Sequence, residues 1–194
     1  MELPYRALEG TFVGLEPFVP ELKEEVRSAL DCDPETWALM PHNGMGQHFD
    51  RYWADLCAMT HFMPYAIRCR SNARVVGMSG FLTERMKDGG VQIGGTFLHP
   101  DVRGGVVNPE AKLLMLAHAF ACGAVRVQIV VDSRNQRSQA AVAKLGAVRE
   151  GVLRRDRRTW TGYVRDSVVF SILGSEWPAV KARLEQRVAR GGAE

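Results

Sequence analysis

Residues 94–120 constrain the fold of this chain most, because they place a β-like segment, a glycine-bearing loop and a helix in direct succession. The pattern predicts a short strand at 95–98, a turn at 99–101 and a helix that opens near Asn108. The first N–H groups of a helix lack partners within it, and the helix dipole favours negative charge there. The stretch is therefore a place that can hold a phosphate group.

The overall composition limits the class of protein. A length of 194 residues suits a single domain spanning 1–194 with a full core. Hydrophobic residues make up 46% and charged residues 24%, which is ordinary for a globular protein. No apolar run approaches the roughly 20 residues that span a bilayer, and the acidic start does not resemble a signal peptide. Four scattered cysteines without a CxxC pair indicate reduced thiols, so we expect a cytoplasmic protein with no membrane contact and no metal.

The net charge of +3 conceals an asymmetry along the chain. Residues 1–50 hold 3 basic and 10 acidic side chains, a balance of −7, whereas the remainder holds 22 basic and 12 acidic ones, a balance of +10. A basic body can attract nucleic acid or a polyanionic small molecule, although an ordinary solvated surface explains it equally well. The dense run 154–158 lacks the interleaved aromatic residues of a stacking platform, which argues against nucleic acid as a partner.

Periodicity and turn residues predict the order of the elements. Strands are expected at 8–16, 62–70, 74–83, 91–98, 125–131, 148–153 and 163–173. Helices are expected at 21–30, 46–59, 109–121, 136–145 and 175–188, with a short helical piece after Asp33. Asn135 and Gly146 are expected to cap one of these helices, and Gly123 to end the helix before it. The succession predicts a mixed α/β fold.

Three stretches carry a family resemblance. The block DSRNQRSQAAVAKLGAVREGVLR contains an Asn, a small polar residue three positions on, then Lys-Leu-Gly and Arg-Glu-Gly. Together with residues 103–112 and the closing VRDSVVFSILGSEW, it resembles the GCN5-related N-acetyltransferase (GNAT) superfamily, and most of all the RimJ/RimL-like group that acetylates N-terminal amines of ribosomal proteins. The resemblance implies a GNAT-like α/β (mixed α+β) domain. Its twisted, mostly antiparallel sheet of about seven strands would splay at the cofactor site, with helices on both faces.

The resemblance also implies acetyl-CoA as co-substrate, bound at a loop that the family writes as Gln/Arg-x-x-Gly-x-Gly/Ala. Here Arg103 is present, but Val106 and Asn108 occupy the two small-residue positions. Because valine does not readily adopt a positive φ, either the loop backbone differs or Gly104 and Gly105 supply the tight turn. All five residues are implied to hold the pyrophosphate, mostly by backbone N–H groups, with the arginine suited to phosphate oxygens. The plain alternative is a surface turn capped by Asn108.

The remaining site residues follow from the same resemblance. Backbone N–H groups around Phe97 and Leu98 are expected to polarise the acyl carbonyl, as an oxyanion hole does. Asn135 matches the residue that bonds the pantetheine arm, although its position also suits a simple helix cap. Many relatives carry a tyrosine as the acid for the leaving thiolate. That position is Val142 here, which leaves Ser138, also counted among the cofactor contacts, or a water as the proton donor.

The sequence singles out no general base and no metal site. An α-amine with a pKa near ~8 is already partly neutral at pH 7, so a chain of waters can serve as the base. Glu84, Glu150 and Asp156 are expected to be surface ions. His42 and His48 are six positions apart, which matches no metal-binding spacing on a helix.

Three functions stay open. The first is an acetyl-CoA-dependent N-acetyltransferase that acts directly on a primary amine such as a protein N-terminus. The charge of residues 1–50 would favour a basic peptide there if that region lines the groove. The second is a small-molecule N-acyltransferase for an amino acid, a polyamine or an antibiotic. The third is a non-catalytic module that binds acyl-CoA or nucleic acid. The apolar stripe of the last helix, which contains Trp177, is compatible with a homodimer, but packing on the chain's own sheet is the simpler expectation.

Overall fold

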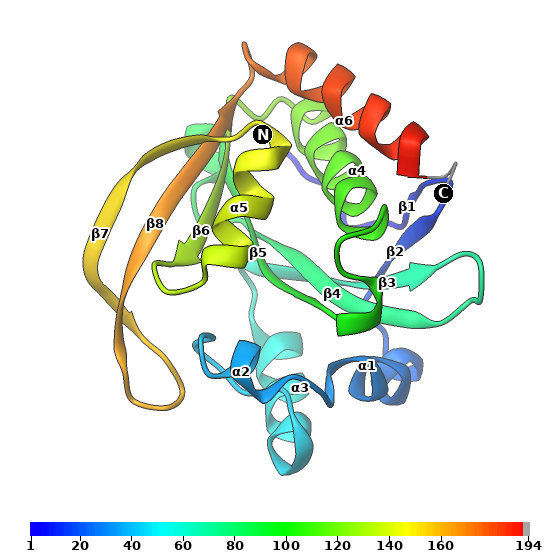
Figure 1. Cartoon of the computed structure of the whole chain (residues 1–194), viewed down its shortest axis with the longest axis vertical. Coiled ribbons are helices and arrows are strands. Elements are labelled where there is room, and N and C mark those ends of the chain that lie inside the picture. Colours follow the sequence, from blue (N-terminus) through cyan, green and yellow to red (C-terminus); the bar gives the residue numbers. More distant parts are fainter. Residues whose placement is uncertain (192–194) are drawn as a thin grey trace.

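The computed structural model describes residues 1–191 and shows one eight-stranded sheet with helices on both faces (Figure 1). The strands are β1 (Leu8–Glu9), β2 (Val13–Pro17), β3 (Phe62–Cys69), β4 (Val75–Leu82), β5 (Gly90–Leu98), β6 (Arg126–Asp132), β7 (Val148–Arg158) and β8 (Val164–Leu173). The α-helices are α1 (Lys23–Leu30), α2 (Pro34–Trp37), α3 (Phe49–Ala58), α4 (Val107–Ala121), α5 (Gln136–Leu145) and α6 (Trp177–Gly191). Short 3-10 helices are η1 (Pro20–Leu22), η2 (Gly46–His48), η3 (Met86–Asp88) and η4 (Pro100–Val102).

The sheet separates at its centre. Its strand order is β1-β2-β3-β4-β5-β6-β8-β7, and each neighbouring pair is antiparallel except β5 with β6. These two strands run parallel and pair only from Gly90 opposite Arg126 to Ile93 opposite Ile129. Beyond that point they diverge, which leaves one edge of each strand without a strand partner. The mixed α/β fold and the splayed, mostly antiparallel sheet are therefore confirmed.

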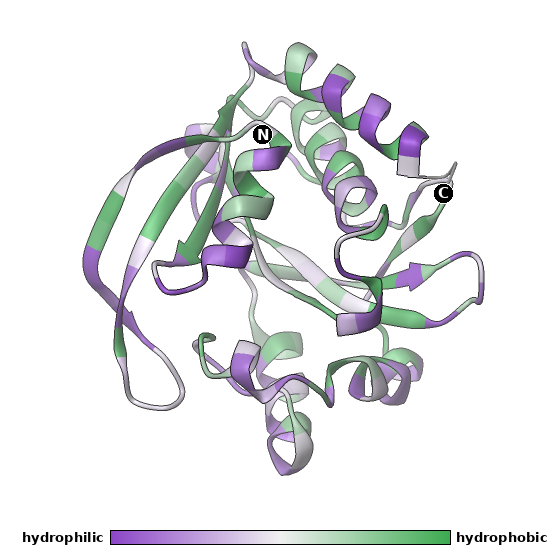
Figure 2. Ribbon diagram, in the orientation of Figure 1, coloured by the Kyte–Doolittle hydropathy of each residue, from purple (hydrophilic) through white to green (hydrophobic). Residues whose placement is uncertain are grey.

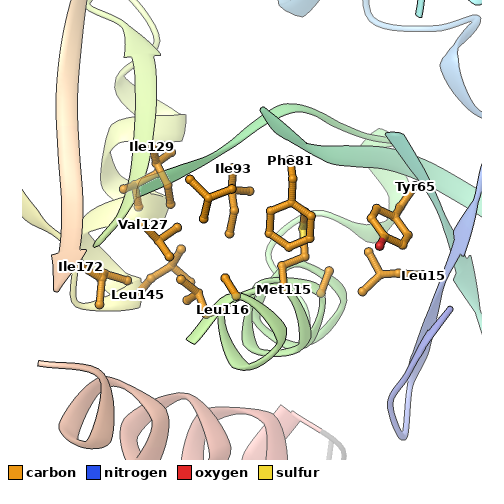
Figure 3. Close-up of a cluster of buried hydrophobic side chains, with 14 of the residues drawn as sticks. Leu15, Tyr65, Phe81, Ile93, Met115, Leu116, Val127, Ile129, Leu145 and Ile172 are labelled. Atoms are coloured by element: carbon orange, nitrogen blue, oxygen red, sulfur yellow. The ribbon is translucent and has the colours of Figure 1, made fainter. Parts of the chain in front are cut away.

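Two hydrophobic cores fill the two faces of the sheet. On one face, α4, α5 and α6 cover a cluster that includes Phe81, Ile93, Met115 and Leu116 (Figure 3). On the other face, α1, α2 and α3 cover a second cluster built around Trp37. Each core forms because amphipathic helices bury their apolar stripes against the strands. The sheet thus lies between two layers of helices.

The last helix packs on other helices. Val180, Leu184 and Val188 form its buried stripe, and Trp177 stacks on Phe120 of α4 with 5.1 Å between ring centroids. Figure 2 shows hydrophilic residues alternating with these apolar ones along α6. The expectation that the stripe packs directly on the sheet is wrong, because α4 and α5 already cover that face. Within residues 1–191, no helix has the length and hydropathy needed to cross a membrane.

The helix caps follow from local sequence. The Asn135 side chain accepts the N–H of Ser138 at 3.0 Å, and Gly146 ends the same helix with φ of 97°. Gly123 follows α4 with φ of 87°, a conformation that glycine adopts without steric cost. All three cap predictions are confirmed.

One predicted strand is wrong. Residues 8–16 form a hairpin, β1 antiparallel to β2, instead of a single strand. Glu110 of α4 holds the turn, because its carboxylate accepts three backbone N–H groups of residues 11–13 at 2.7–2.8 Å. A Cβ at Gly10 would lie 2.7 Å from the Glu110 carboxyl carbon, so the turn needs glycine there. This clamp spans about a hundred residues, and no local pattern reveals it. It also explains why the sheet has eight strands where about seven were expected.

Candidate active site

The loop between β5 and α4 presents a row of free backbone N–H groups. Those of residues 104–106 make no hydrogen bond to the described part of the chain. The helix itself begins without a side-chain cap, so the N–H groups at 107 and 108 are open as well. Residue 109 is a proline, which has no N–H to leave unpaired. The row is therefore suited to an anion, which the dipole of the 15-residue helix α4 also favours.

Gly104 makes the tight turn of this loop. Its φ is 85°, whereas Val106 has an ordinary right-handed conformation with φ of −76°. A Cβ placed on Gly104 or Gly105 would meet nothing within 4 Å, so the loop is open on its outer side. Asn108 lies inside the first helical turn and does not cap α4, which removes the alternative of an Asn108-capped surface turn. The valine at the first small-residue position is tolerated because the left-handed residue comes two positions earlier.

Two of the three nitrogens of the Arg103 guanidinium bond protein groups, and the third, Nη2, is buried without a partner within residues 1–191. Nη1 forms a hydrogen-bonded ion pair with the Asp33 carboxylate, and Nε donates to the Leu98 carbonyl at 2.8 Å. The side chains of Arg103 and Asp33 are 19% and 13% exposed, so the pair is largely buried. The backbone N–H of Arg103 is also in use, donating to the Pro100 carbonyl at 3.1 Å. As a phosphate ligand Arg103 stays a prediction, and what the structure shows is an anchor between the loop and α2.

Asp33 connects α2 to the loop before α4. It adopts a left-handed conformation with φ of 57° and caps α2 by accepting the N–H of Thr36 at 3.1 Å. From α5, Arg137 donates to the Thr36 hydroxyl at 2.7 Å. Burial by itself raises the pKa of Asp33, but hydrogen bonds from Thr36 and Arg103 outweigh it and lower the pKa to about 2. The short helix is thus tied to the loop before α4 and to α5.

Strand β5 bulges beside this loop. Gly95 and Thr96 together stand opposite Ser79 of β4, and Gly95 has φ of 60°. Phe97 and Leu98, whose N–H groups are the predicted oxyanion donors, follow on the same strand past the point where β6 departs. The Phe97 side chain is buried and stacks on Trp37 with 4.8 Å between centroids. The bulge and the open edge place backbone amides at the splay, and the oxyanion role itself stays a prediction.

Lys112 lies beneath the bulge, and sequence reasoning missed it. Its Nζ donates to the hydroxyls of Ser79 at 2.9 Å and Thr96 at 2.7 Å. These hydroxyls are 2.8 Å apart. Burial lowers the pKa of Lys112 to about 7. A lysine in an amphipathic helix is normally expected to face solvent, so only the fold reveals this buried cluster.

The start of α5 lies on the other side of the opening. Asn135 is confirmed as a helix cap, and its bond to the pantetheine arm stays a prediction. Ser138 is half-buried, and its hydroxyl makes no hydrogen bond within residues 1–191. Val142 is buried in the core below α6 and offers no proton. The structure therefore leaves Ser138 available as the predicted acid without testing that role.

A cavity of about 160 Å³ opens under the splay, on the side of α2 and α3. It reaches β5 at Gly94 and Gly95 and β6 at Val130, where the two strands have separated. Most of its lining is apolar or aromatic, including Trp37, whereas Phe49 and Trp53 belong to the core. A smaller hollow of about 90 Å³ lies at the other end of β5, where the strands are still paired. Of the two, only the larger cavity reaches the part of β5 that has separated from β6.

The charged side chains in the lining of this cavity are arginines. Arg157 of β7 and Arg165 of β8 stand opposite each other in register, and both line it together with the imidazole of His42. No carboxylate contributes to the lining. Residues 37–59 contribute several side chains, none of them acidic, so the charge of residues 1–50 does not make this cavity suited to a basic peptide.

The other candidate carboxylates belong to ion pairs. Glu150 accepts hydrogen bonds from Arg126 and Ser171, which lower its pKa to about 2. Glu84 lies 3.4 Å from His61 on the surface. Asp156 bonds Arg157 at 3.0 Å. Glu84 and Glu150 agree with the expectation of surface ions, whereas the Asp156 side chain is only 19% exposed, and none of the three carboxylates lines the 160 Å³ cavity.

Comparison with known proteins supplies the family. A family model described as an acetyltransferase (GNAT) domain matches residues 13–148. The chain belongs to the GNAT family of acetyltransferases. A suspected acetyltransferase from T. thermophilus has a similar structure, with 36% identity and a TM-score of 0.87 over 97% of this chain and 99% of that one. No curated protein gives a match.

Two further solved structures share the fold of this GNAT domain. A GCN5-related N-acetyltransferase from Brucella melitensis is 22% identical, with a TM-score of 0.89 over 95% of this chain and 86% of that one. RimJ from Mycobacterium smegmatis, solved in complex with CoA-disulfide, is 22% identical, with a TM-score of 0.76 over 93% and 91%. The GNAT fold uses acetyl-CoA, and the open amides at residues 104–108 fit a phosphate-bearing molecule of that kind.

Proposed function

We propose that this enzyme moves the acetyl group of acetyl-CoA directly to a primary amine while both substrates are bound. One observation supports the proposal: the cavity lined by arginines reaches the opening between β5 and β6, and the loop that follows β5 carries the free amides. Acetyl-CoA supplies an acyl group activated as a thioester. The protein then needs to hold the two substrates in line, because positioning alone accounts for much of the rate in such a reaction.

Each side of the opening has its own task in this proposal. The N–H groups of residues 104–108 hold the pyrophosphate, and Asn135 and Ser138 at the start of α5 bind the pantetheine arm. Backbone amides at Phe97 and Leu98 donate to the carbonyl oxygen as negative charge develops on it. Ser138 or a water returns a proton to the thiolate. Because no carboxylate lines the cavity, a water takes the proton from the amine.

The size of the cavity bears on which amine is the acceptor. The cavity has room for about ten waters, if each needs roughly 15 Å³ by this measure. That space suits one amino-acid residue or a small molecule. An N-terminal α-amine of a protein, as in the RimJ/RimL-like group, and a free small amine both satisfy it. We place the enzyme in the cytoplasm, which its four free cysteines support. A homodimer stays a prediction, and the buried stripe of α6 cannot form its interface.

A thiol-release assay with acetyl-CoA, a panel of small amines and a panel of N-terminal peptides tests this function. We expect turnover with at least one class of acceptor. Measurable binding of CoA together with no thiol release on any amine would overturn the catalytic proposal in favour of a binding module.

The loop can be tested by the variant Gly104→Ala. A Cβ strains the φ of 85°, which displaces the free amides, so we expect CoA affinity by calorimetry to fall about 10-fold. Gly123→Ala is the matched control, because Gly123 has nearly the same φ of 87° and equally open surroundings but lies after α4. Equal CoA affinity in the two variants would remove the loop from the site.

A further inference from the structure

Arg165 is a buried cation without an ion pair within residues 1–191. The residue is 5% exposed, and its partners are neutral: the hydroxyl of Ser167 at 3.2 Å from Nε and the carbonyl of Leu39 at 3.3 Å from Nη1. Nη2 has no partner in that part of the chain, yet it is not among the atoms sealed inside the protein. Since Arg165 lines the 160 Å³ cavity, that nitrogen opens into the cavity. Arg103, the comparable buried arginine, has Asp33 as its counter-ion.

The charges around Arg165 do not neutralise it. Asp132 is paired with Arg134 at 2.7 Å, and Asp156 with Arg157 at 3.0 Å. The charges of these four groups cancel in pairs, so none of them serves as a counter-ion for Arg165. Buried charges in proteins are normally paired, because an unpaired one loses its hydration without a compensating contact. Arg165 therefore lacks a counter-ion, and an acceptor bound in the cavity can provide one.

We propose that Arg165 binds a carboxylate of the acceptor, so that the substrate is an amine that also carries an acid group. This inference rests on the proposed function and names its substrate class. A guanidinium offers two parallel N–H donors that match the two oxygens of a carboxylate. Arg157, opposite Arg165 across β7 and β8, also lines the cavity, but it is already paired with Asp156, so Arg165 is the cation left for the acceptor. Polyamines and basic peptides meet no carboxylate there and are poor acceptors.

The sheet register indicates where the acid stands relative to the amine. The amine must reach the splay, which the cavity meets at Val130 and Gly95. Val130 pairs with Val169, and Arg165 lies four positions away along β8, roughly 13 Å at ~3.3 Å per residue. The long arginine side chain covers part of that distance. The carboxylate is therefore several bonds away from the reacting nitrogen, as in a glutamate side chain or the end of a short peptide.

Matched acceptors test the proposal directly. One pair is free glutamate and glutamine, and the other is a peptide with glutamate near its N-terminus and the same peptide with glutamine. We expect kcat/KM to be at least ~10-fold higher for the acid member of the pair that fits. A preference confined to the free amino acids identifies a small-molecule substrate, and one confined to the peptides identifies a protein N-terminus. Equal rates for acid and amide members, or faster turnover of a basic peptide, would overturn the proposal.

Variants assign the effect to Arg165. Arg165→Gln should abolish the acid preference through KM for the acceptor, with KM for acetyl-CoA unchanged, and Arg165→Lys should retain part of it. Arg154→Gln is the control, since Arg154 carries the same charge on the neighbouring strand β7, is exposed and does not line the cavity. Far-UV circular dichroism checks that each variant folds. An acid preference that persists in Arg165→Gln shows that another group binds the carboxylate.

A binding measurement separates this inference from the proposed function. The N-acetylated form of the glutamate peptide cannot react further, so calorimetry reports its affinity without catalysis. Binding to the wild type that falls at least ~10-fold in Arg165→Gln, but not in Arg154→Gln, supports the carboxylate site even if thiol release fails. Equal affinity of all three proteins for the acid and amide forms of this probe rejects it.

Discussion

The ammonium group of Lys112 is surrounded by hydroxyls, and burial alone shifts its protonation. Its folded pKa of about 7 lies below the ~10.4 of an unfolded lysine. Between these values the unfolded chain binds more protons, so the free energy of unfolding rises with pH. Below pH ~7 both states are protonated, and the cost of burying the charge is fully present.

Replacing Lys112 by methionine should remove this pH dependence. We expect the free energy of unfolding of the wild type to gain up to about 1.4 kcal/mol per pH unit, relative to Lys112→Met, between pH ~7 and ~10. Urea unfolding of both proteins at pH 7, 8 and 9 measures the difference in their free energies of unfolding. The contributions of titratable groups that both proteins share cancel in this difference. Parallel curves would mean that the amine is solvated in the folded state.

Helix α2 has only four residues, too few to be stable by itself, and polar contacts hold it in place. Asp33 caps it and receives Arg103, while Arg137 reaches Thr36 from α5. The cavity runs along this helix at Trp37. Its position, and with it the wall of the acceptor cavity, depends on side chains from the two elements that flank the cofactor side of the opening.

Removing the Asp33 carboxylate should therefore destabilise the protein. Asp33→Ala leaves the largely buried guanidinium of Arg103 unpaired, and we expect a loss of about 3 kcal/mol in urea unfolding at pH 7. Arg137→Ala is the milder comparison, because Arg137 is 59% exposed, and should cost less than about 1 kcal/mol. The folded pKa of Asp33 is depressed to about 2, so its contribution is present above pH ~4 and lost as the pH falls through ~2.

A double variant checks the mechanism. If the Asp33→Ala effect comes from the unpaired guanidinium, adding Arg103→Met should restore part of the lost stability. Additive losses in the double variant would show that the two side chains act independently.

Across the whole molecule, the parts that sequence could predict are local. Helix caps depend on neighbouring residues, as at Asn135, Gly146 and Gly123. The strand, loop and helix within 94–120 are likewise predicted by the order of residues in that stretch alone. What escaped prediction are the contacts that site residues make with partners far along the chain. Arg103 finds Asp33, Lys112 finds Ser79 and Arg165 finds Leu39, and each contact exists only after the sheet has formed. A family motif predicts where the cofactor binds, but it cannot show which cation is left unpaired.

In the folded protein, the acidic and the basic parts of the sequence partly neutralise each other. Acidic side chains of residues 1–50 pair with basic ones from distant segments, as Glu16 and Glu25 do with Arg68, and Glu9 with Arg70. Ion pairs within the molecule therefore neutralise part of the positive charge of residues 51–194. The net charge of the chain is only +3. A nucleic-acid surface needs a continuous row of free cations, because each neutralised phosphate contributes separately to affinity.

We therefore expect no specific binding to nucleic acid. Fluorescence anisotropy with a labelled duplex of about 20 base pairs should give a Kd no tighter than ~1 µM at physiological salt, the range of non-specific contacts. The same preparation should bind CoA, which shows that the protein is folded and its loop is available. Tight binding to the duplex that weakens steeply between about 50 and 200 mM salt, where counterion release acts, would instead assign a function to the run of arginines at 154–158. The ion pair between Arg157 and Asp156 argues against that outcome, since it already neutralises one cation of the run.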